Sequence, residues 1–382
     1  MNGIYYYGIA FILIWFIAII FKGQLEKYGV DVGFPVIMWR TKRLRGLINR
    51  IANISPRFWK WFMNFGILIS IFFMILMAYA LIISLTTITE SANVAILLPG
   101  VEMPGSPIFI PFFYGFIALI TVLVVHEFSH GILARAEKIN IKSIGLILFA
   151  ILPGAFVEPD EDEMDKAPKS TRLRIFAAGS MANLSLALVA FLIFSAIGSY
   201  GIPGFFDESG IEIKQVVDDS PSYGVLKEGM IITAINGEEV HDSDSYLNAV
   251  SNFKPNDNAT IVTNQGTFHL KLVENPNNKS LGYMGIQGEI HLETKDTLLG
   301  DQIPWVLFTF SELFKWIFFL NFAVGTFNLL PAKPLDGGHM LEDLLRYKLP
   351  ENIVRTIITS LTAIFWIIII FSILYSLFLG MS

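Results

Sequence analysis

The sequence predicts a polytopic α-helical membrane protein with about six transmembrane helices and a small inserted α+β domain. Three observations predict this fold class. Of the 382 residues, 53% are hydrophobic and 16% are charged, whereas soluble domains carry about 25% charged residues. Apolar runs close to the ~20 residues that span a bilayer recur along the chain. Between two of these runs, residues 205–290 are polar, with short segments of alternating hydrophobicity.

The expected membrane helices cover about 3–21, 61–86, 110–136, 172–198, 303–330 and 353–379. The first run lacks a basic leading region and a small-residue cleavage site, which favours a retained span over a signal peptide. The first, second and last runs have no charged residue deep inside and are typical of anchors. The other three contain polar groups in apolar surroundings, which are costly in lipid and usually functional.

The charged residues predict an orientation for these helices. Nine Lys and Arg residues lie between positions 22 and 60, and the positive-inside rule places this loop in the cytoplasm. Alternation then puts the loop 87–109, the inserted domain and both termini on the outer side. The stretch 41–60 resembles an interfacial amphipathic helix, with Trp59 and Trp61 at the depth of the headgroups. A net charge of −6 gives no indication of nucleic-acid binding.

Residues 140–157 are apolar but are interrupted by Gly145, Pro153 and Gly154. This stretch predicts a re-entrant or strand-like element, which must be shielded by protein or line a water-filled cavity. The acidic run from Glu158 to Glu163 follows, and we expect it to form a solvated cytoplasmic loop.

The polar region has turn-forming pairs, such as Asn236-Gly237, between its alternating segments. Strands are expected at 211–217, 230–235, 259–264 and 267–273, and a short helix at 243–252. The expected domains are N-terminal transmembrane helices with a basic loop (1–109), a first part of the membrane core (110–200), the inserted domain (201–291), a second part of the core (292–347) and a C-terminal transmembrane helix (348–382).

The segment His126-Glu127-Phe128-Ser129-His130 carries the chemistry. On a helix, positions i and i+4 share a face, so both imidazoles can reach one metal ion. Glu127 lies beside them and can take a proton from a metal-bound water. The segment directly follows the apolar run 112–125, where unpaired His and Glu side chains would be costly. Because the chain has no cysteine, a zinc site must use His, Asp or Glu ligands.

A catalytic zinc ion normally takes three protein ligands and leaves one position for water. Asp336 is the candidate for the third ligand, because it follows helix-ending prolines and precedes Gly337 and Gly338, which allow close backbone approach. Asp336 can also cap the helix that begins at Gly337, and the two roles are compatible. His339 is a rival ligand, although a position beside the ligands or at an interface is favoured for it.

Small residues in the fourth predicted helix, including Gly179 and Ala182, permit close helix packing. Asn183 follows them, and an amide within the membrane needs hydrogen-bond partners. It can hold a substrate backbone or stabilise an oxyanion.

These motifs resemble the site-2 protease family of intramembrane metalloproteases, in the family's order and over about residues 110–345. His126–His130 resembles the family's zinc-binding motif, and Gly179–Asn183 its Gly-x-x-x-Asn motif. Asn328–Gly337 is similar to its Asn-x-x-Pro-x-x-x-x-Asp-Gly motif, and Pro153–Pro159 to its membrane-associated strand region.

The resemblance implies a multi-pass zinc metalloendopeptidase of the cell membrane. Such an enzyme hydrolyses peptide bonds in transmembrane protein or peptide substrates within the lipid bilayer, as in regulated intramembrane proteolysis, with its active site toward the cytoplasm. The implied site comprises one zinc ion on His126, His130 and Asp336, the general base Glu127, and the substrate-facing or oxyanion residues Asn183 and Asn328. Ser180 stands where the family often has proline, and we expect it hardly to affect the chemistry.

The inserted region resembles a PDZ domain of the bacterial, permuted kind, through Ser220–Ile232 and the following Ile235-Asn236-Gly237. Met230 replaces the usual aspartate. The resemblance implies either a peptide ligand added at a sheet edge or a domain that excludes bulky ectodomains.

Two other classes of protein were weighed. A metal transporter or channel predicts ionisable residues spread along several spans. Here they cluster toward one end, apart from Glu312 and Lys315, which can pair on one helix face. An inactive membrane scaffold presenting a PDZ domain predicts a broken motif, whereas the metal-binding motif is intact. The sequence therefore favours the protease.

Overall fold

The computed structural model describes residues 4–86, 98–102, 106, 108–276, 278–295 and 302–379. Most of the loop 87–109, which was predicted to lie outside the membrane, falls outside the described residues. The chain forms two compact units: Met1–Phe194 together with Glu312–Ser382, and Ser195–Ser311. Each unit is described by itself below.

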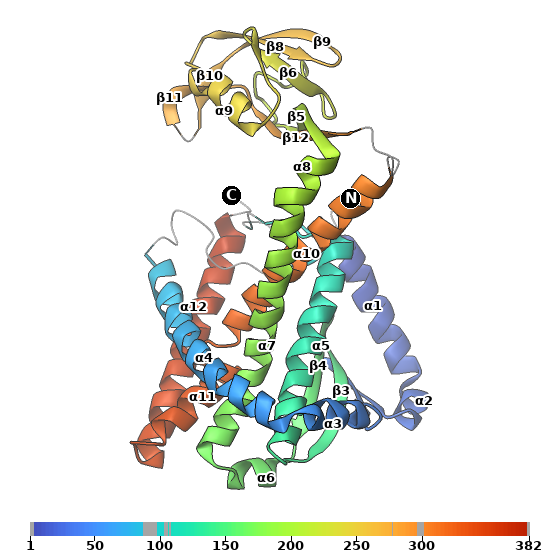
Figure 1. Ribbon diagram of the computed structural model, residues 1–382, viewed down its shortest axis with the longest axis vertical. Helices are drawn as coiled ribbons and strands as arrows, with labels where there is room; N and C mark the ends of the chain where they lie inside the picture. The colour runs from blue at the N-terminus through green and yellow to red at the C-terminus, as the bar shows by residue number, and fades with distance from the viewer. Residues whose placement is uncertain are drawn as a thin grey trace. The chain divides into compact units, whose positions relative to one another are not determined.

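The first unit is built from long helices (Figure 1). They are α4 (Pro56–Ser84), α5 (Phe112–Ala136), α7 (Lys169–Ala196), α10 (Gln302–Phe327) and α12 (Glu351–Leu379). Within the described part of the chain, five helices are long and apolar enough to cross a membrane, and one of them continues from α7 to Phe205. At 1.5 Å per residue, even 25 residues extend about 38 Å, which exceeds a hydrocarbon core of about 30 Å.

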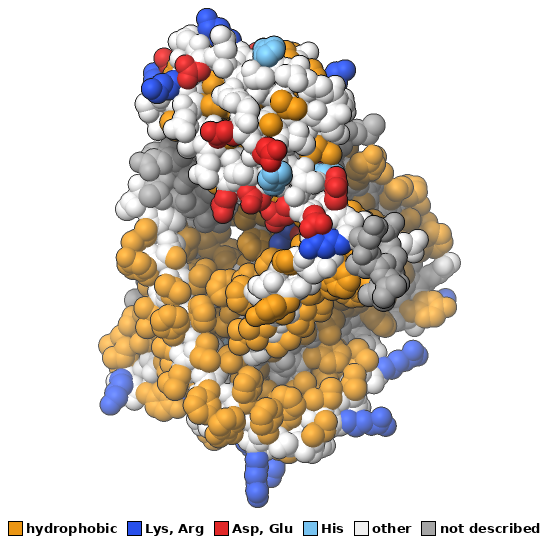
Figure 2. Space-filling view, turned by 45° about the horizontal axis from the view of Figure 1, so that its top comes forward, with side chains coloured by type: hydrophobic (Ala, Val, Ile, Leu, Met, Phe, Trp, Pro, Cys, Tyr) orange, Lys and Arg blue, Asp and Glu red, His pale blue; other side chains and the backbone are white. Residues whose placement is uncertain are grey.

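The first predicted span is the apolar helix α1 (Ile4–Ile20), which has 17 residues and is shorter than the other five. Its length of about 26 Å falls just below the thickness of the hydrocarbon core. Figure 2 shows hydrophobic side chains covering the helical surface of the first unit. Large side chains such as Leu68, Ile75 and Ile367 are exposed there. A continuous apolar surface of this kind is suited to contact with lipid.

A four-stranded antiparallel sheet in the order β1-β2-β3-β4 lies within the first unit. The apolar stretch predicted to be strand-like forms the hairpin β3 (Ile141–Phe149) and β4 (Leu152–Pro159), which packs against α5 (Figure 1). The strands β1 (Val30–Gly33) and β2 (Val36–Thr41) were not predicted, and β2 pairs with β3. Because β4 pairs only with β3, its other edge is left for other partners.

The predicted amphipathic helix over 41–60 is shorter than expected. It is α3 (Arg45–Ile54), which follows the short α2 (Lys22–Lys27). The side chain of Ser55 caps a new helix whose first residue is Pro56, and proline is favoured at this position because its missing N–H needs no partner there. Both tryptophans of the stretch therefore lie at the start of α4 instead.

Buried charges connect the helix ends of the first unit. Glu137, at the end of α5, is 5% exposed and pairs with Lys60 at 3.1 Å and Arg174 at 2.6 Å. Burial alone would raise the pKa of Glu137, but the hydrogen bonds from Arg174 and Lys60 hold that pKa below its ordinary value. Arg172 of α7 likewise donates to the buried Asp343 at 2.9 Å.

The second unit contains a sheet in the order β12-β5-β6-β8-β9, with β7 paired to β6. Its elements are η1 (Ile197–Gly201), α8 (Ile202–Phe205), β5 (Phe206–Val216), β6 (Ile231–Ile235), β7 (Glu238–Glu239), α9 (Ser243–Ser251), β8 (Asn258–Thr263), β9 (Gly266–Lys271), β10 (Val273–Asn275), β11 (Asn278–Tyr283) and β12 (Ile286–Thr294). All four predicted strands and the predicted helix are confirmed. Asn236 and Gly237 adopt positive φ values of 51° and 87° in the turn between β6 and β7, as a two-residue hairpin turn requires.

Candidate metal centre

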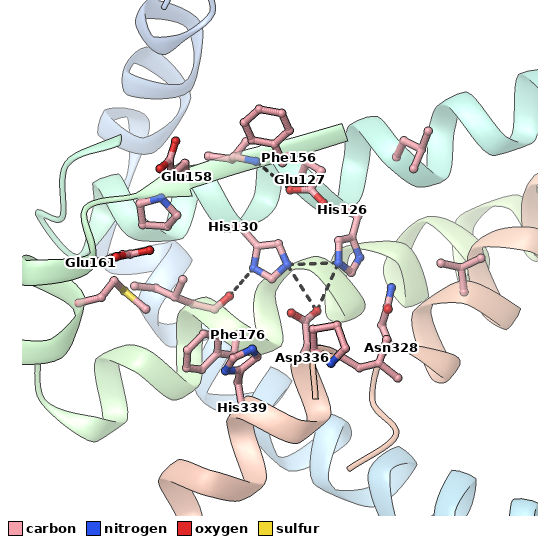
Figure 3. Close-up of a pocket in the computed structure, with 18 of the residues that line it drawn as sticks. His126, Glu127, His130, Phe156, Glu158, Glu161, Phe176, Asn328, Asp336 and His339 are labelled. Carbon is pink, nitrogen blue, oxygen red and sulfur yellow. Dashed lines mark hydrogen bonds and ion pairs between the residues drawn. The ribbon is translucent and has the colours of Figure 1, made fainter. Parts of the chain in front are cut away.

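Helix α5 presents His126 and His130 one turn apart. Their Nε2 atoms lie 3.2 Å from each other (Figure 3). The side chains of both histidines are largely buried, at 11% and 13% exposure. The i, i+4 spacing therefore brings both imidazoles to one point inside the first unit.

Asp336 completes the group from another part of the chain. After α10, the segment 328–335 leads to α11 (Asp336–Leu345). The Oδ2 atom of Asp336 lies 3.3 Å from His126 Nε2 and 3.4 Å from His130 Nε2. The N-cap of α11 is Leu335, and no side chain caps this helix end. The prediction that Asp336 caps the helix is therefore wrong, because its carboxylate faces the histidines instead.

The two glycines after Asp336 allow the chain to fold back closely. A Cβ atom at Gly337 would collide with the carbonyl groups of Leu329 and Leu330, and one at Gly338 would lie 2.6 Å from the carbonyl carbon of Ala332. The N–H of Gly337 donates to the carbonyl of Asn328 at 2.9 Å. Without this close approach, α11 could not bring its first carboxylate to the histidines.

The three atoms fit a bound zinc ion. Zinc bonds of about 2.0–2.1 Å in a tetrahedron place neighbouring ligand atoms about 3.3–3.4 Å apart. The separations between the two Nε2 atoms and Oδ2 are 3.2, 3.3 and 3.4 Å. Among the described residues, His126, His130 and Asp336 form a group of metal-ligating side chains. The spacing and the donor types match a three-ligand site with one open position.

Residues of α7 contact all three ligand candidates, the two histidines through their Nδ1 atoms and Asp336 through Oδ2. His130 Nδ1 lies 2.7 Å from the carbonyl oxygen of Ile175, and His126 Nδ1 lies 3.2 Å from Asn183 Nδ2. The hydroxyl of Ser180 donates to Asp336 Oδ2 at 3.4 Å. Ser180 therefore contacts a ligand candidate, and its effect on the chemistry stays a prediction. The contacts of Ile175 and Ser180 were not predicted, although positions 175, 179 and 183 share the 4-residue spacing of a helix face.

Glu127 points toward the strand β4. Its Oε2 atom accepts a hydrogen bond from the N–H of Val157 at 3.0 Å, and its side chain lines the same cavity as the metal-ligand candidates. The free edge of β4 thus fixes one carboxylate oxygen and leaves the other for a partner in the cavity.

The cavity has a volume of about 720 Å³. One part of its wall is apolar, with Val122, Leu123 and Val324, and another part is acidic, with Glu158 and Glu161. No Lys or Arg is among the described lining residues. This wall can accommodate an uncharged polypeptide segment next to the ligand group.

Two further residues of this wall were singled out in the sequence. Asn328 lines the cavity, as does His339, whose ring stacks on Phe176 at a centroid distance of 5.0 Å (Figure 3). His339 is not part of the ligand group, so the alternative in which it binds the metal receives no support from the geometry.

The acidic run is more ordered than predicted. Asp160 caps the short helix α6 (Glu161–Lys166) through Glu163 N–H at 3.1 Å. Glu163 accepts a hydrogen bond from Asn140 N–H at 2.6 Å, and Glu158 accepts one from Ser143. The prediction of a loop is therefore wrong for this run, which lies at the end of β4 and in α6, whereas its partly or fully exposed side chains agree with the predicted solvation.

The fold and the site together define a membrane metalloprotease, in which two histidines of one helix, a distant aspartate and an adjacent glutamate meet among membrane-spanning helices. A family model described as peptidase family M50 matches residues 114–369. The chain belongs to peptidase family M50, whose membrane zinc metalloproteases include the site-2 protease type.

The chain is also similar to individual proteins and to a solved structure. The "Uncharacterized protein MJ0971" of Methanocaldococcus jannaschii is 30% identical over 309 residues, which cover 75% of this chain and 74% of that protein. The "Membrane-bound transcription factor site-2 protease homolog" of Arabidopsis thaliana is 29% identical over 135 residues, which cover 35% of this chain and 26% of that protein. A solved PDZ domain of an SdrC-like protein from Listeria monocytogenes is 25% identical over 21% of this chain and 87% of its own length, with a TM-score of 0.19.

Proposed function

We propose that this chain hydrolyses peptide bonds in the transmembrane segments of membrane-anchored protein substrates. The observation that carries the proposal is the triangle of His126 Nε2, His130 Nε2 and Asp336 Oδ2, with sides of 3.2–3.4 Å. It lies in a cavity lined by helices that are long and apolar enough to cross a membrane. Proteolysis within or beside the bilayer is the activity that fits both features.

His126, His130 and Asp336 would hold one zinc ion. When bound, zinc lowers the pKa of a coordinated water toward ~7 and polarises the scissile carbonyl. Glu127 accepts the proton of the attacking water and later delivers it to the leaving amine. The hydrogen bond from Val157 N–H to Glu127 supports this role, because it orients the carboxylate before the substrate arrives.

The substrate pairs with the free edge of β4 in an extended conformation. Val157 N–H points away from β3, toward Glu127, and the two-residue period of a strand directs Ala155 N–H to the same side. A substrate helix must first unwind, because its carbonyl groups are already hydrogen-bonded within the helix. An added strand would satisfy its backbone, and Asn328 would contact the substrate from the opposite wall of the cavity.

The cavity faces the cytoplasmic side of the cell membrane in this proposal, and the inserted domain 201–291 faces the outside. The basic residues between positions 22 and 60 support this orientation through the positive-inside rule. The inserted domain separates the core segments 110–200 and 292–347, and it either binds a peptide or excludes bulky substrates.

Cleavage of a single-span model substrate by the purified, detergent-solubilised protein tests this function. We expect the wild type to cut, a chelator to stop the cleavage, and Glu127→Gln to retain zinc while losing activity. Zinc content is measured on both proteins. A wild type that contains no metal, or a Glu127→Gln variant that cuts at the wild-type rate, would refute the proposal.

A further inference from the structure

Asn183 is a fully buried amide of α7 whose contact with a metal-ligand candidate constrains its role. Its exposure is 0%, and its Nδ2 atom lies 3.2 Å from His126 Nδ1. Its Oδ1 atom has no hydrogen-bond partner among the described residues. Buried amide oxygens are normally hydrogen-bonded, so this arrangement calls for an explanation.

The hydrogen-bonding rules of histidine supply that explanation. With Nδ2 of Asn183 facing it, His126 Nδ1 must accept, which leaves the proton on Nε2, the atom that points to Asp336. A metal on Nε2 requires the other tautomer, in which Nδ1 carries the proton and donates it. Turning the amide by 180° then places Oδ1 opposite Nδ1–H and forms the bond that a ligating histidine needs.

A second buried asparagine, Asn321, also has an Oδ1 atom without a hydrogen-bond partner among the described residues, and differs from Asn183 in what its Nδ2 atom faces. Nδ2 of Asn321 in α10 donates to Thr121 Oγ1 at 2.9 Å and to the carbonyl of Ile317 at 2.8 Å. Two oxygen acceptors fix the orientation of that amide. Asn183 has a histidine nitrogen in the corresponding place, so its orientation follows the tautomer of His126.

One face of α7 orients both histidines. Ile175, Gly179 and Asn183 are spaced four residues apart, which places them on the same side of the helix. The carbonyl of Ile175 contacts His130 Nδ1 at 2.7 Å. Gly179 leaves the space for both rings, because a Cβ atom there would lie 2.7 Å from His126 Nε2. Asn183 then has the same relation to His126 as Ile175 has to His130.

We propose that Asn183 is a positioning residue whose Oδ1 accepts the Nδ1–H of His126 and so directs Nε2 to the metal. The inference rests on the metal site of the proposed function. It differs from the substrate-binding or oxyanion role expected from the sequence, because an oxyanion role requires the amide N–H groups and has no effect on metal affinity.

Zinc affinity separates the two roles. It is measured by competition with a zinc chelator on the purified full-length protein, for the wild type, Asn183→Leu, Asn183→Asp and Asn321→Leu. Loss of an acceptor beside a ligating histidine typically weakens metal binding 10–100-fold, so we expect this loss in Asn183→Leu. Asn183→Asp retains an acceptor oxygen and is expected to bind within a few-fold of the wild type. Asn321→Leu removes an equally buried amide away from the site and should bind as the wild type does.

Size-exclusion chromatography and thermal melting of each protein without metal show whether it is folded. Asn183→Ala serves as the acceptor-free variant if Asn183→Leu does not fold. Wild-type zinc affinity in the acceptor-free variant would overturn the proposal and favour an oxyanion role. Equal losses of zinc affinity in Asn183→Asp and Asn183→Leu would also overturn the proposal, because they would show that the acceptor oxygen is not what matters. A wild type that binds zinc but cuts nothing refutes the proposed function and leaves this comparison intact.

Discussion

Replacing Gly179 by alanine tests whether the packing of α7 against α5 sets the metal site. An added Cβ atom would lie 2.7 Å from both Cε1 and Nε2 of His126, and closer still to His130 Nε2. Real Cβ contacts at such distances are essentially absent, so something must move. The atoms in the way belong to the two proposed ligands, which can yield only by leaving their positions.

The size of the effect follows from this geometry. Inserting a methyl group into a well-packed site costs about 1–3 kcal/mol. If the histidine rings move aside to relieve this strain, the free energy of zinc binding becomes less favourable by a similar amount. Each 1.4 kcal/mol corresponds to about a tenfold change in affinity. We therefore expect Gly179→Ala to weaken zinc binding by roughly 10–100-fold and to reduce cleavage at limiting zinc.

Chelator competition on the purified protein measures the change. Gly198→Ala is a matched control, because a Cβ atom at Gly198 meets nothing within 4 Å. The control should bind zinc as the wild type does. Wild-type affinity in Gly179→Ala would show that α7 can retreat without moving the histidines, and would refute the reasoning.

Three further predictions concern the surroundings of the site. Asp343→Leu leaves Arg172 buried without its partner. This change should lower the free energy of unfolding by about 3–5 kcal/mol, which thermal unfolding measures. Arg172→Met added to this variant should recover part of that loss, and no recovery would argue against the pair. Because the pKa of Glu137 is lowered in the folded state, its stabilisation is complete above the ordinary carboxyl pKa and is lost as the pH falls through the folded value. Thermal melts of the wild type and Glu137→Gln should therefore differ at pH 7 and converge in acid, and a constant difference would contradict this. Ala155→Pro removes an N–H from the free edge of β4 and should reduce kcat/KM with unchanged zinc affinity, whereas unchanged cleavage would argue against strand pairing.

Local patterns predicted most of the chemistry. Two histidines at i and i+4 on an apolar helix predict their shared face without knowledge of any other element. Asp336 was identified from its neighbouring prolines and glycines, but its helix-capping role was predicted wrongly. A carboxylate at a helix start is normally taken by the backbone N–H groups, and the sequence alone does not show that two histidines compete for it.

The remaining features depend on contacts between distant parts of the chain. Val36–Thr41 is a strand because it pairs with Ile144–Phe149, more than a hundred residues later in the sequence. Nothing in this six-residue segment itself predicts that partner. Asn183 was identified as an amide that needs partners, but the identity of the partner depends on how α5 and α7 pack.

The small residues of α7 link packing and chemistry. Gly179 leaves space for the His130 ring, whose Nδ1 atom lies 2.7 Å from the carbonyl oxygen of Ile175 one turn earlier in α7. Gly337 and Gly338 allow the start of α11 to approach the backbone of residues 329–333 closely, and this approach carries Asp336 to the histidines. From the sequence alone, the small residues are explained by close helix packing. In the structure, the same close packing also holds the three ligand atoms 3.2–3.4 Å apart. A larger residue at Gly179 would therefore act first on the histidine rings, whereas one at Gly337 or Gly338 would collide with the backbone that brings Asp336 to the site.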